Sequence, residues 1–479
     1  MTPTNTNAAP GQRLALALVL LAATACGGGS SASPSDRLTQ FTRQELERQG
    51  VPGAAVAVIE NGELVYQQGF GFKDLARTAP VGPDTLFGAG STTKMLVASA
   101  VLTLVEQGKL DLDAPVTDYV PTFQVASGDP SSITLRHLLS HTSGLPDIER
   151  LGSCNQDLAQ WFQDEARRAP IMSTPGTLWN YSGQGYMLAG LVLEELSGES
   201  FEDAMRHRVF DPAGMEHATF DPQVARQRDH SLGHLAPQAR EVELDSYTCR
   251  ATEPAGAALF LSAPEMARFA QALLSGGGAI LAPGSVAALE ASEMETHQIP
   301  GEAYGLGLAA RDVPEAGAPG TRIYYHGGND GRFAASVALV PERGFAVVVL
   351  FNGTVSAPDV VSQKALELFL GIREALPGPT LIENPGKWRT DPSTWVKYTG
   401  TYDEPYTYGR AVVTLEEEKL FVEMVDQAPG VKREMMQVAQ DYFAVLATGI
   451  DVTFWFGEDP QAASYVVTRR GVFTRADGT

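Results

Sequence analysis

The sequence STTKMLVASAVLTLV, residues 91–105, is the strongest single indication of how this chain folds. From Met95 to Val105 nearly every residue is apolar, so a helix formed here has no face suited to water. We therefore expect a helix that is buried on all sides by other elements. Ser91 and Lys94 stand three residues apart at its start, which places their side chains on one face of the first turn.

Extended segments are expected far from this helix, near both ends of the same unit. Two apolar-rich runs, Ala54–Ile59 and Leu64–Gln68, flank Asn61-Gly62, which is a type I′ hairpin signal. The remaining patterns are strands at 334–340 and 345–351 and helices at 188–196 and 264–274. Strands at both ends with helices between them predict an α+β fold in which distant segments close one antiparallel sheet.

A different pattern occupies the C-terminal part of the chain. Proline and glycine punctuate residues 376–392, as in a linker. Short alternating runs follow at a spacing near ten residues, at 411–415, 420–425, 442–446, 452–456 and 465–468. This spacing predicts a small antiparallel β-barrel or sandwich.

Composition excludes several classes of protein. The 479 residues carry 35 Lys and Arg against 57 Asp and Glu, a formal net charge of −22, and 44% are hydrophobic. This hydrophobic content argues against disorder along most of the chain. The acidic balance argues against nucleic-acid binding, which needs clustered Lys and Arg. The long apolar run is confined to the extreme N-terminus, so several membrane spans are excluded.

That N-terminal run is expected to be a signal. Arg13 precedes ten Leu, Ala and Val residues, 14–23, too few to span a bilayer. The following Ala23-Thr24-Ala25-Cys26 resembles the end of a bacterial lipoprotein signal, which implies lipidation of Cys26 and an extracytoplasmic, lipid-anchored protein. Ordinary secretion with a free thiol is the alternative. Processing that resists globomycin would contradict the lipoprotein interpretation.

Ser91 and Lys94 can support nucleophilic chemistry. A helix N-terminus carries partial positive charge, and burial also disfavours a lysine cation, so both favour a neutral Lys94 that takes the Ser91 proton. The backbone N–H of Ser91 could then stabilise an oxyanion. A Ser-x-x-Lys spacing often occurs by chance, so the other motifs of the chain determine whether this one marks a catalytic site.

The accompanying motifs are LLSHTSGLP at residues 138–146, YSGQGY at 181–186, PAG at 254–256 and HGGN at 326–329. With these motifs the chain resembles the serine β-lactamase-related family of class C β-lactamases, penicillin-binding-protein-like carboxypeptidases, D-aminopeptidases and esterases, over roughly residues 38 to 372. The segment from Tyr398 resembles the lipocalin-like β domain of some members. The resemblance implies a β-lactamase-like sheet with a helical subdomain, followed by a small C-terminal antiparallel β-barrel.

The domains expected on this basis are a lipoprotein signal at 1–25, a flexible tether at 26–36, a serine hydrolase domain at 37–375, a linker at 376–392 and a lipocalin-like β domain at 393–479. By the same resemblance Ser91 is the acylated nucleophile, Lys94 its proton acceptor and Tyr181 the second acid–base residue. His326, Gly328 and Asn329 belong to the substrate and oxyanion region, with the Asn329 N–H as the second oxyanion donor. No metal and no organic cofactor is implied.

Two departures from the family pattern bear on the substrate. Gly183 stands where relatives usually have Asn, and His326 stands where many have Lys, which removes a permanent positive charge. Both changes weaken the case for a true β-lactamase or D-Ala-D-Ala carboxypeptidase, and they fit an esterase or a peptidase of altered specificity. We expect a serine hydrolase that acts through an acyl-enzyme on a small ester, an amide or a peptidoglycan-derived substrate, with an ester favoured. A D-aminopeptidase, a D-Ala carboxypeptidase or a weak β-lactamase remains open, as does a non-catalytic lipoprotein that binds penicillin or senses peptidoglycan.

Cysteine and histidine pairs complete the expectations. An oxidising compartment permits a disulfide between Cys154 and Cys249, and the alternative is two separate buried thiols. Counting thiols in denatured, unreduced protein would distinguish the two.

His137 and His141 lie four residues apart without an intervening Glu or a third ligand. We expect them to cap and pack a turn rather than bind a metal.

Overall fold

The fold of the protein is given by a computed structural model, which describes most but not all of the chain. The described residues are 32–147, 158–160, 166–235, 240–242, 258–299, 301–315, 318–353, 358–373, 376, 391–405, 408–439, 441–446, 450–457, 459–468 and 471–476. The expected signal, Cys26, Cys154, Cys249 and most of the expected linker lie outside the described residues.

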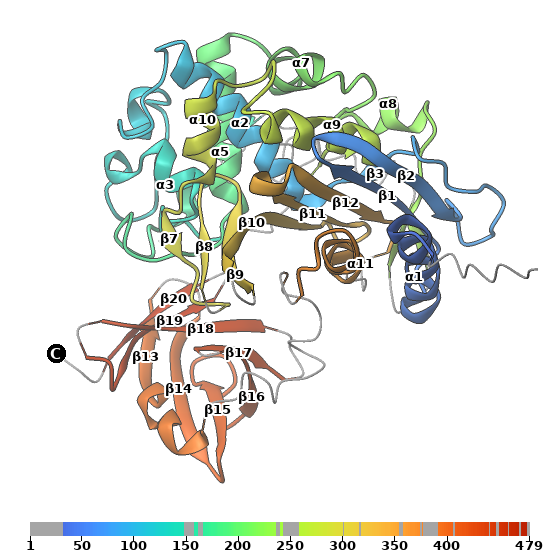
Figure 1. The fold of residues 1–479 in the computed structure, drawn as a ribbon. Helices are drawn as coiled ribbons and strands as arrows, with labels where there is room; N and C mark the ends of the chain where they lie inside the picture. Colours follow the sequence, from blue (N-terminus) through green and yellow to red (C-terminus); the bar gives the residue numbers. More distant parts are fainter. Residues whose placement is uncertain are drawn as a thin grey trace, which may run out of the picture.

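An antiparallel sheet of eight strands forms the centre of the larger part (Figure 1), in the order β2-β1-β12-β11-β10-β9-β8-β7. Its strands are β1 (Gly53–Glu60), β2 (Glu63–Gly71), β7 (Met294–Glu295), β8 (Glu302–Tyr304), β9 (Ala309–Glu315), β10 (Ala318–Asn329), β11 (Ala334–Val340) and β12 (Phe345–Phe351). The expected α+β fold closed by distant segments is confirmed, because β1 pairs with β12, for example Ala54 with Phe351.

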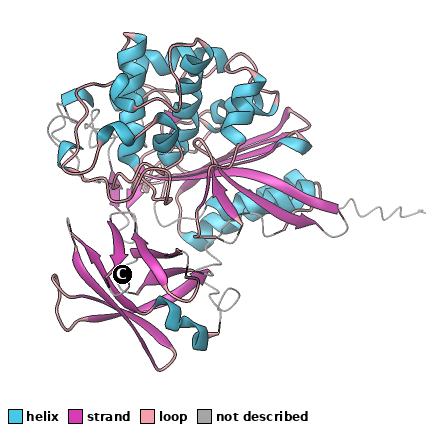
Figure 2. Ribbon diagram, turned by 90° about the vertical axis from the view of Figure 1, so that its left-hand side faces the viewer, coloured by secondary structure: helices cyan, strands magenta, loops and turns pink. Residues whose placement is uncertain are grey.

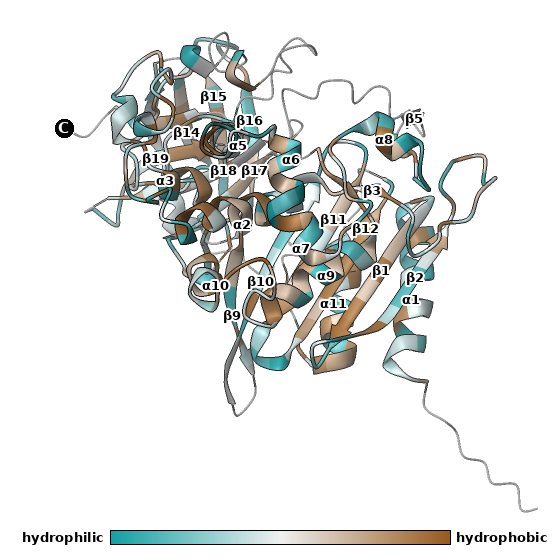
Figure 3. Cartoon of the chain, turned by 90° about the horizontal axis from the view of Figure 1, so that it is seen from above, coloured by the Kyte–Doolittle hydropathy of each residue, from teal (hydrophilic) through white to brown (hydrophobic). Residues whose placement is uncertain are grey.

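The N-terminal hairpin forms at the expected turn. Asn61 and Gly62 have φ of 53° and 79°, both in the left-handed region that a type I′ turn requires. In β1, residues 55, 57 and 59 enter one hydrophobic cluster, while residues 54, 56 and 58 enter another. Both faces of the strand are therefore buried. Figure 3 shows the hydrophobic colour that runs along much of β1.

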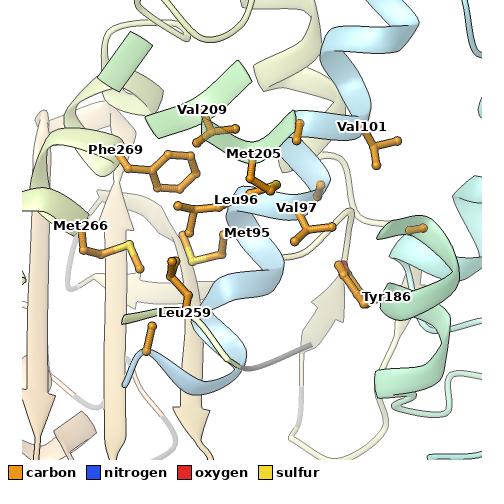
Figure 4. Packing of buried hydrophobic residues seen from close by; sticks show 14 of the residues in the cluster. Met95, Leu96, Val97, Val101, Tyr186, Met205, Val209, Leu259, Met266 and Phe269 are labelled. Carbon is orange, nitrogen blue, oxygen red and sulfur yellow. The ribbon is translucent and has the colours of Figure 1, made fainter. Parts of the chain in front are cut away.

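Helices cover the two faces unequally (Figure 2), with most of them on one side and α1 (Pro34–Gln49) and α11 (Pro358–Ala365) on the other. On the larger side α2 (Thr93–Glu106) is buried along its first twelve residues, so the expected buried helix is confirmed. Figure 4 shows its Met95, Leu96, Val97 and Val101 among side chains of neighbouring elements. The helices expected near 188–196 and 264–274 are α5 (Gly183–Ser197) and α9 (Ala263–Leu274).

Shorter elements fill the rest of this part. The helices are α3 (Leu135–Leu139), α6 (Phe201–Met205), α7 (Asp211–Ala213), α8 (Pro222–Arg226) and α10 (Pro283–Glu290), with π-helical turns at Arg206–Phe210 and Leu366–Leu370. The 3₁₀ turns are η1 (Gly90–Thr92), Val116–Asp118, Pro130–Ser132, Ala166–Arg168, Pro341–Arg343 and Pro392–Tyr398. Two small sheets pair β3 (Phe87–Gly88) with β6 (Phe260–Leu261) and β4 (Gly233–Leu235) with β5 (Arg240–Val242).

The C-terminal part is a closed barrel of eight antiparallel strands, which confirms the expected β-barrel. Its strands are β13 (Gly400–Glu404), β14 (Gly409–Glu416), β15 (Lys419–Met424), β16 (Lys432–Ala439), β17 (Tyr442–Val445), β18 (Ile450–Phe456), β19 (Ala463–Thr468) and β20 (Gly471–Arg475). The five runs expected from the sequence correspond to five of these strands, whereas β13, β16 and β20 were missed. Aromatic side chains fill the interior, among them Tyr398, Tyr402, Phe443 and Phe454.

Within the described residues, no helix is both long and apolar enough to cross a membrane. The same part of the chain contains no group of three or more His, Cys, Asp or Glu side chains placed to hold a metal ion.

Candidate active site

Ser91 lies in the short turn that joins β3 to the buried helix. It is the middle residue of η1, and Lys94 is the second residue of α2. The Lys94 Nζ lies 3.1 Å from the Ser91 Oγ, within hydrogen-bond reach. Lys94 is only 2% exposed, whereas Ser91 is partly open to solvent. The arrangement therefore places an amine beneath an accessible hydroxyl, as a nucleophile and its base require.

Two glycines allow β10 to approach this turn closely. Gly90 has φ of 54°, and a Cβ on it would lie 2.6 Å from the backbone nitrogen of Asn329. A Cβ on Gly328 would lie 2.2 Å from the carbonyl oxygen of Ala89. Side chains at either position would separate β10 from η1. The close approach brings the backbone of Asn329 beside Ser91, where the sequence predicts the second oxyanion donor.

Tyr181 reaches the same site from the segment that leads into α5. Its ring centroid lies 4.9 Å from the Lys94 Nζ, and that of Tyr186 lies 5.5 Å from it, so the amine is bounded by two aromatic rings. Ser182 caps α5 by accepting the N–H of Gly185, which fixes where the helix begins. The third predicted side chain of the acid–base group thus lies next to the other two.

A cavity of about 360 Å³ joins these residues to the end of β10. The predicted site residues on its wall are Ser91, Tyr181, His326, Gly328 and Asn329. Lys94 lies behind Ser91 rather than on the wall. All six residues that the sequence singled out for chemistry are therefore within one site, although their roles stay predictions.

His326 is held as a neutral ring. Its Nδ1 lies 2.6 Å from the carbonyl oxygen of Gly327, which can only accept, so Nδ1 carries the proton. Its Nε2 is then the acceptor for the hydroxyl of Tyr304, at 2.8 Å. Burial lowers the pKa of His326 to about 3. At neutral pH this position therefore offers no positive charge to a substrate.

Two carboxyl groups that the sequence did not single out also line the cavity, Glu302 and Asp359. Glu302 accepts hydrogen bonds from Thr296, at 2.7 Å, and from Tyr325. Burial raises the pKa of Glu302, and burial raises the pKa of Asp359 to about 6. No sequence signal could have found them, because their burial beside Ser91 depends on strands and a helix that follow it by more than two hundred residues.

The two histidines of the LLSHTSGLP region do separate structural work, as expected. His137 completes a capping box with Thr134 at the start of α3. His141 is fully buried, with its ring centroid 4.2 Å from that of Tyr181.

An antiparallel sheet covered by helices, with a Ser-Lys pair at the start of the central helix and a Tyr beside it, defines a class of protein: serine hydrolases with the beta-lactamase fold. A sequence model of the beta-lactamase family matches residues 38–371, and the chain belongs to this family.

Similar curated proteins include penicillin-binding proteins and an esterase. Penicillin-binding protein 4 of Amycolatopsis lactamdurans is 31% identical over 64% of this chain and 82% of its own length. Esterase EstB of Burkholderia gladioli is 30% identical over 61% of this chain and 83% of its own. Penicillin-binding protein 4* of Bacillus subtilis (strain 168) is 26% identical and extends over 87% of this chain and 92% of its own.

Solved structures match nearly the whole chain. The octameric penicillin-binding protein homologue from Pyrococcus abyssi has a TM-score of 0.62, and SurE has one of 0.70. Each is 23% identical and aligns with 92% of this chain and 99% of its own. At this identity the likeness shows the fold alone, and it extends beyond the 38–371 region.

Proposed function

We propose that the protein is an esterase that works through an acyl-enzyme on Ser91. The observation that carries this proposal is the charge of the cavity. Its wall presents a reactive hydroxyl, a neutral His326 and the carboxyl groups of Glu302 and Asp359, and no Lys or Arg is among the described residues that line it.

The charge of the cavity separates the possible substrates. β-Lactams and peptides ending in D-Ala-D-Ala carry a free carboxylate, which Asp359 would repel once it ionises above its pKa of about 6. Two like charges 4 Å apart repel by about 4 kcal/mol at a dielectric constant near 20. A neutral ester meets no such penalty. A peptide with a free ammonium group also suits these carboxyls, so a D-aminopeptidase is the second candidate.

The proposed reaction uses four residues of the chain. Ser91 Oγ attacks the carbonyl carbon while its proton passes to the Lys94 Nζ, 3.1 Å away. The backbone N–H groups of Ser91 and Asn329 stabilise the oxyanion, each worth about 3 kcal/mol. Tyr181 relays the proton from Lys94 to the departing alkoxide, and the C–O bond breaks. Water then attacks the acyl carbon, and its proton passes through Tyr181 and Lys94 to Ser91 Oγ. The bond between the acyl carbon and Ser91 Oγ breaks, which releases the carboxylic acid and restores the Ser91 hydroxyl.

Substrate panels with matched variants test the proposal. Wild type, Ser91→Ala and Ser99→Ala are assayed with p-nitrophenyl esters, nitrocefin and D-amino-acid p-nitroanilides. Ser99 is a buried serine of the same helix whose hydroxyl bonds only the carbonyl of Met95, at 2.9 Å, among the described contacts. We expect Ser91→Ala to lose at least ~10³-fold in ester turnover and Ser99→Ala to retain it.

Each alternative has its own outcome in that panel. Anilide turnover above ester turnover would favour the D-aminopeptidase. Labelling by fluorescent penicillin without turnover of any substrate would favour the non-catalytic binder. Ester turnover that persists in Ser91→Ala would remove Ser91 as the nucleophile. Lipidation at Cys26 and an extracytoplasmic location remain part of the proposal on the strength of the sequence alone.

A further inference from the structure

His141 is hydrogen-bonded to the residues on both sides of Tyr181. Its backbone carbonyl accepts the N–H of Asn180 at 2.8 Å, and its ring Nδ1 accepts the N–H of Ser182 at 3.1 Å. One residue thus binds the backbone N–H groups of both chain neighbours of the proposed acid–base tyrosine. Because backbone N–H groups need partners when buried, both bonds constrain the path of the chain at Tyr181.

The His141 ring also supports the Tyr181 ring itself. The two centroids are 4.2 Å apart with the planes inclined by 35°. On its other sides the imidazole lies 5.2 Å from the Tyr186 ring and 4.8 Å from the Tyr304 ring, and none of it is exposed. A ring so enclosed cannot move without displacing its neighbours.

The backbone of His141 is itself in an uncommon conformation. Its φ of 59° is in the left-handed region, which costs a residue with a Cβ and is best tolerated by Gly and Asn. The conformation lets one residue present both its carbonyl and its ring toward the 180–182 segment. A strained backbone conformation persists only where the surrounding contacts enforce it, and such positions are often found at functional sites.

Neighbouring residues extend the same contact. Ser182 Oγ donates to the carbonyl of Pro146 at 3.0 Å, and the N–H of Gly183 donates to Asp147 Oδ1 at 2.7 Å. The segment 141–147 therefore forms a continuous support for residues 180–183. The segment 141–147 itself supplies none of the residues that line the cavity.

We propose that His141 is a positioning residue that acts through Tyr181, holding its phenol against Lys94 and the substrate. This inference rests on the proposed function. Because Nδ1 accepts a hydrogen bond, the neutral ring carries its proton on Nε2. What the reaction needs from His141 is therefore an acceptor at the Nδ1 position together with a backbone that tolerates positive φ.

The test compares three substitutions of this residue. His141→Asn keeps an oxygen acceptor at the position of Nδ1 and suits positive φ. His141→Leu fills similar space without an acceptor. His141→Gln carries its amide one bond further out and leaves the Ser182 N–H without a partner at that place. Steady-state kinetics and burst amplitude are measured with a p-nitrophenyl ester, and thermal unfolding verifies that each variant is folded.

We expect His141→Leu and His141→Gln to lower kcat by ~100-fold, in the range of a lost acid–base group, with KM changed less than about threefold. His141→Asn should recover kcat to within about tenfold of wild type. Should His141→Leu fail to fold, the contrast of Gln with Asn carries the same comparison. Equal losses in Asn and Gln, or no loss in either, would overturn the proposal.

A double-mutant cycle separates positioning from a general structural effect. If His141 acts through Tyr181, its substitution should cost less than about threefold once Tyr181→Phe has removed the phenol. The same ~100-fold loss in both backgrounds would show that His141 acts elsewhere and refute the inference. Failure of the proposed function would give a different result. In that case wild type would not turn over esters, or Tyr181→Phe alone would leave kcat unchanged.

Discussion

At the scale of single residues, burial decides which side chains are available for chemistry. Lys94 and His326 are both removed from solvent, but their partners differ. Lys94 faces the Ser91 hydroxyl and two aromatic rings, whereas both nitrogens of His326 are engaged, by Gly327 and Tyr304. His326 is thus a fixed, neutral part of the wall rather than a charged contact for the substrate.

Substitution of His326 tests this neutrality. The pKa of His326 is lowered from 6.5 to about 3, so between these values the unfolded chain binds a proton that the folded protein does not. Wild type should therefore lose stability as pH falls from 6.5 toward 3. His326→Gln, which cannot titrate, should lose less in thermal unfolding at pH 4.5 relative to pH 7.5, and should retain ester kcat/KM within about tenfold.

The control for this comparison is His207→Gln, because His207 is an exposed histidine paired with Glu199 far from the cavity wall. An equal gain in acid stability in both variants would contradict the assignment to His326.

At the scale of elements, α11 contributes both packing and charge. It covers the face of the sheet opposite α2, and its Val361 is fully buried there. Its second residue, Asp359, reaches the cavity from the first turn of the helix. Burial raises the pKa of Asp359 to about 6, although a hydrogen bond with Ser336 of β11 opposes the shift. One helix therefore supplies a carboxyl that is charged only above weakly acidic pH.

The pH dependence of stability follows from this shift. The folded protein binds the Asp359 proton more tightly than the unfolded chain does, so wild type loses stability as pH rises from about 4 to about 6. Asp359→Asn should match wild type near pH 4 and exceed it at pH 8, by at most about 3 kcal/mol for a shift of this size. Denaturant unfolding at both pH values measures the difference.

Asp113 provides a control of opposite sign, because its hydrogen bond with Arg136 lowers its pKa. Asp113→Asn should be less stable than wild type at pH 8 and approach it in acid. A parallel response of the two variants would argue against the Asp359 assignment.

At the scale of the whole molecule, the barrel packs against the end of the sheet that carries β7 and β8 (Figure 1). Trp455 of β18 is 7% exposed, and its ring centroid lies 4.1 Å from that of His297. The next two residues, Gln298 and Ile299, line the active-site cavity. The barrel thus supports one wall of the site without lining it.

Truncation of Trp455 should therefore affect binding more than chemistry. In Trp455→Ala we expect KM for p-nitrophenyl esters to rise about three- to tenfold, equivalent to about 1 kcal/mol, with kcat within about twofold of wild type. The unfolding temperature should also fall, since a large buried side chain is lost. Val396→Ala is the control. Val396 lies in the 3₁₀ turn Pro392–Tyr398 that precedes the barrel and is 64% exposed, so its truncation should change neither KM nor the unfolding temperature. An unaltered KM in folded Trp455→Ala would show that the wall does not depend on this contact.

Local patterns determine much of this protein. The Asn61-Gly62 turn, the apolar helix after Ser91 and five barrel strands all follow from neighbouring residues, because hairpin chemistry and hydrophobic periodicity act over short distances. The Ser91–Lys94 pair is equally local, since one helical turn brings the two side chains together.

Tertiary structure alone decided what surrounds that pair. Four features of the site depend on contacts between segments that lie 40 to more than 250 residues apart. They are the approach of Asn329 to Gly90, the neutral state of His326, the two carboxyl groups of the cavity wall and the hydrogen bonds that place His141 beside Tyr181. Their properties depend on burial and on precise contact, and burial is created only when β1, β10, β11 and β12 assemble into one sheet. Spacing along the chain specifies the nucleophile and its base, whereas packing between distant segments sets the charge and geometry of the site in which they act.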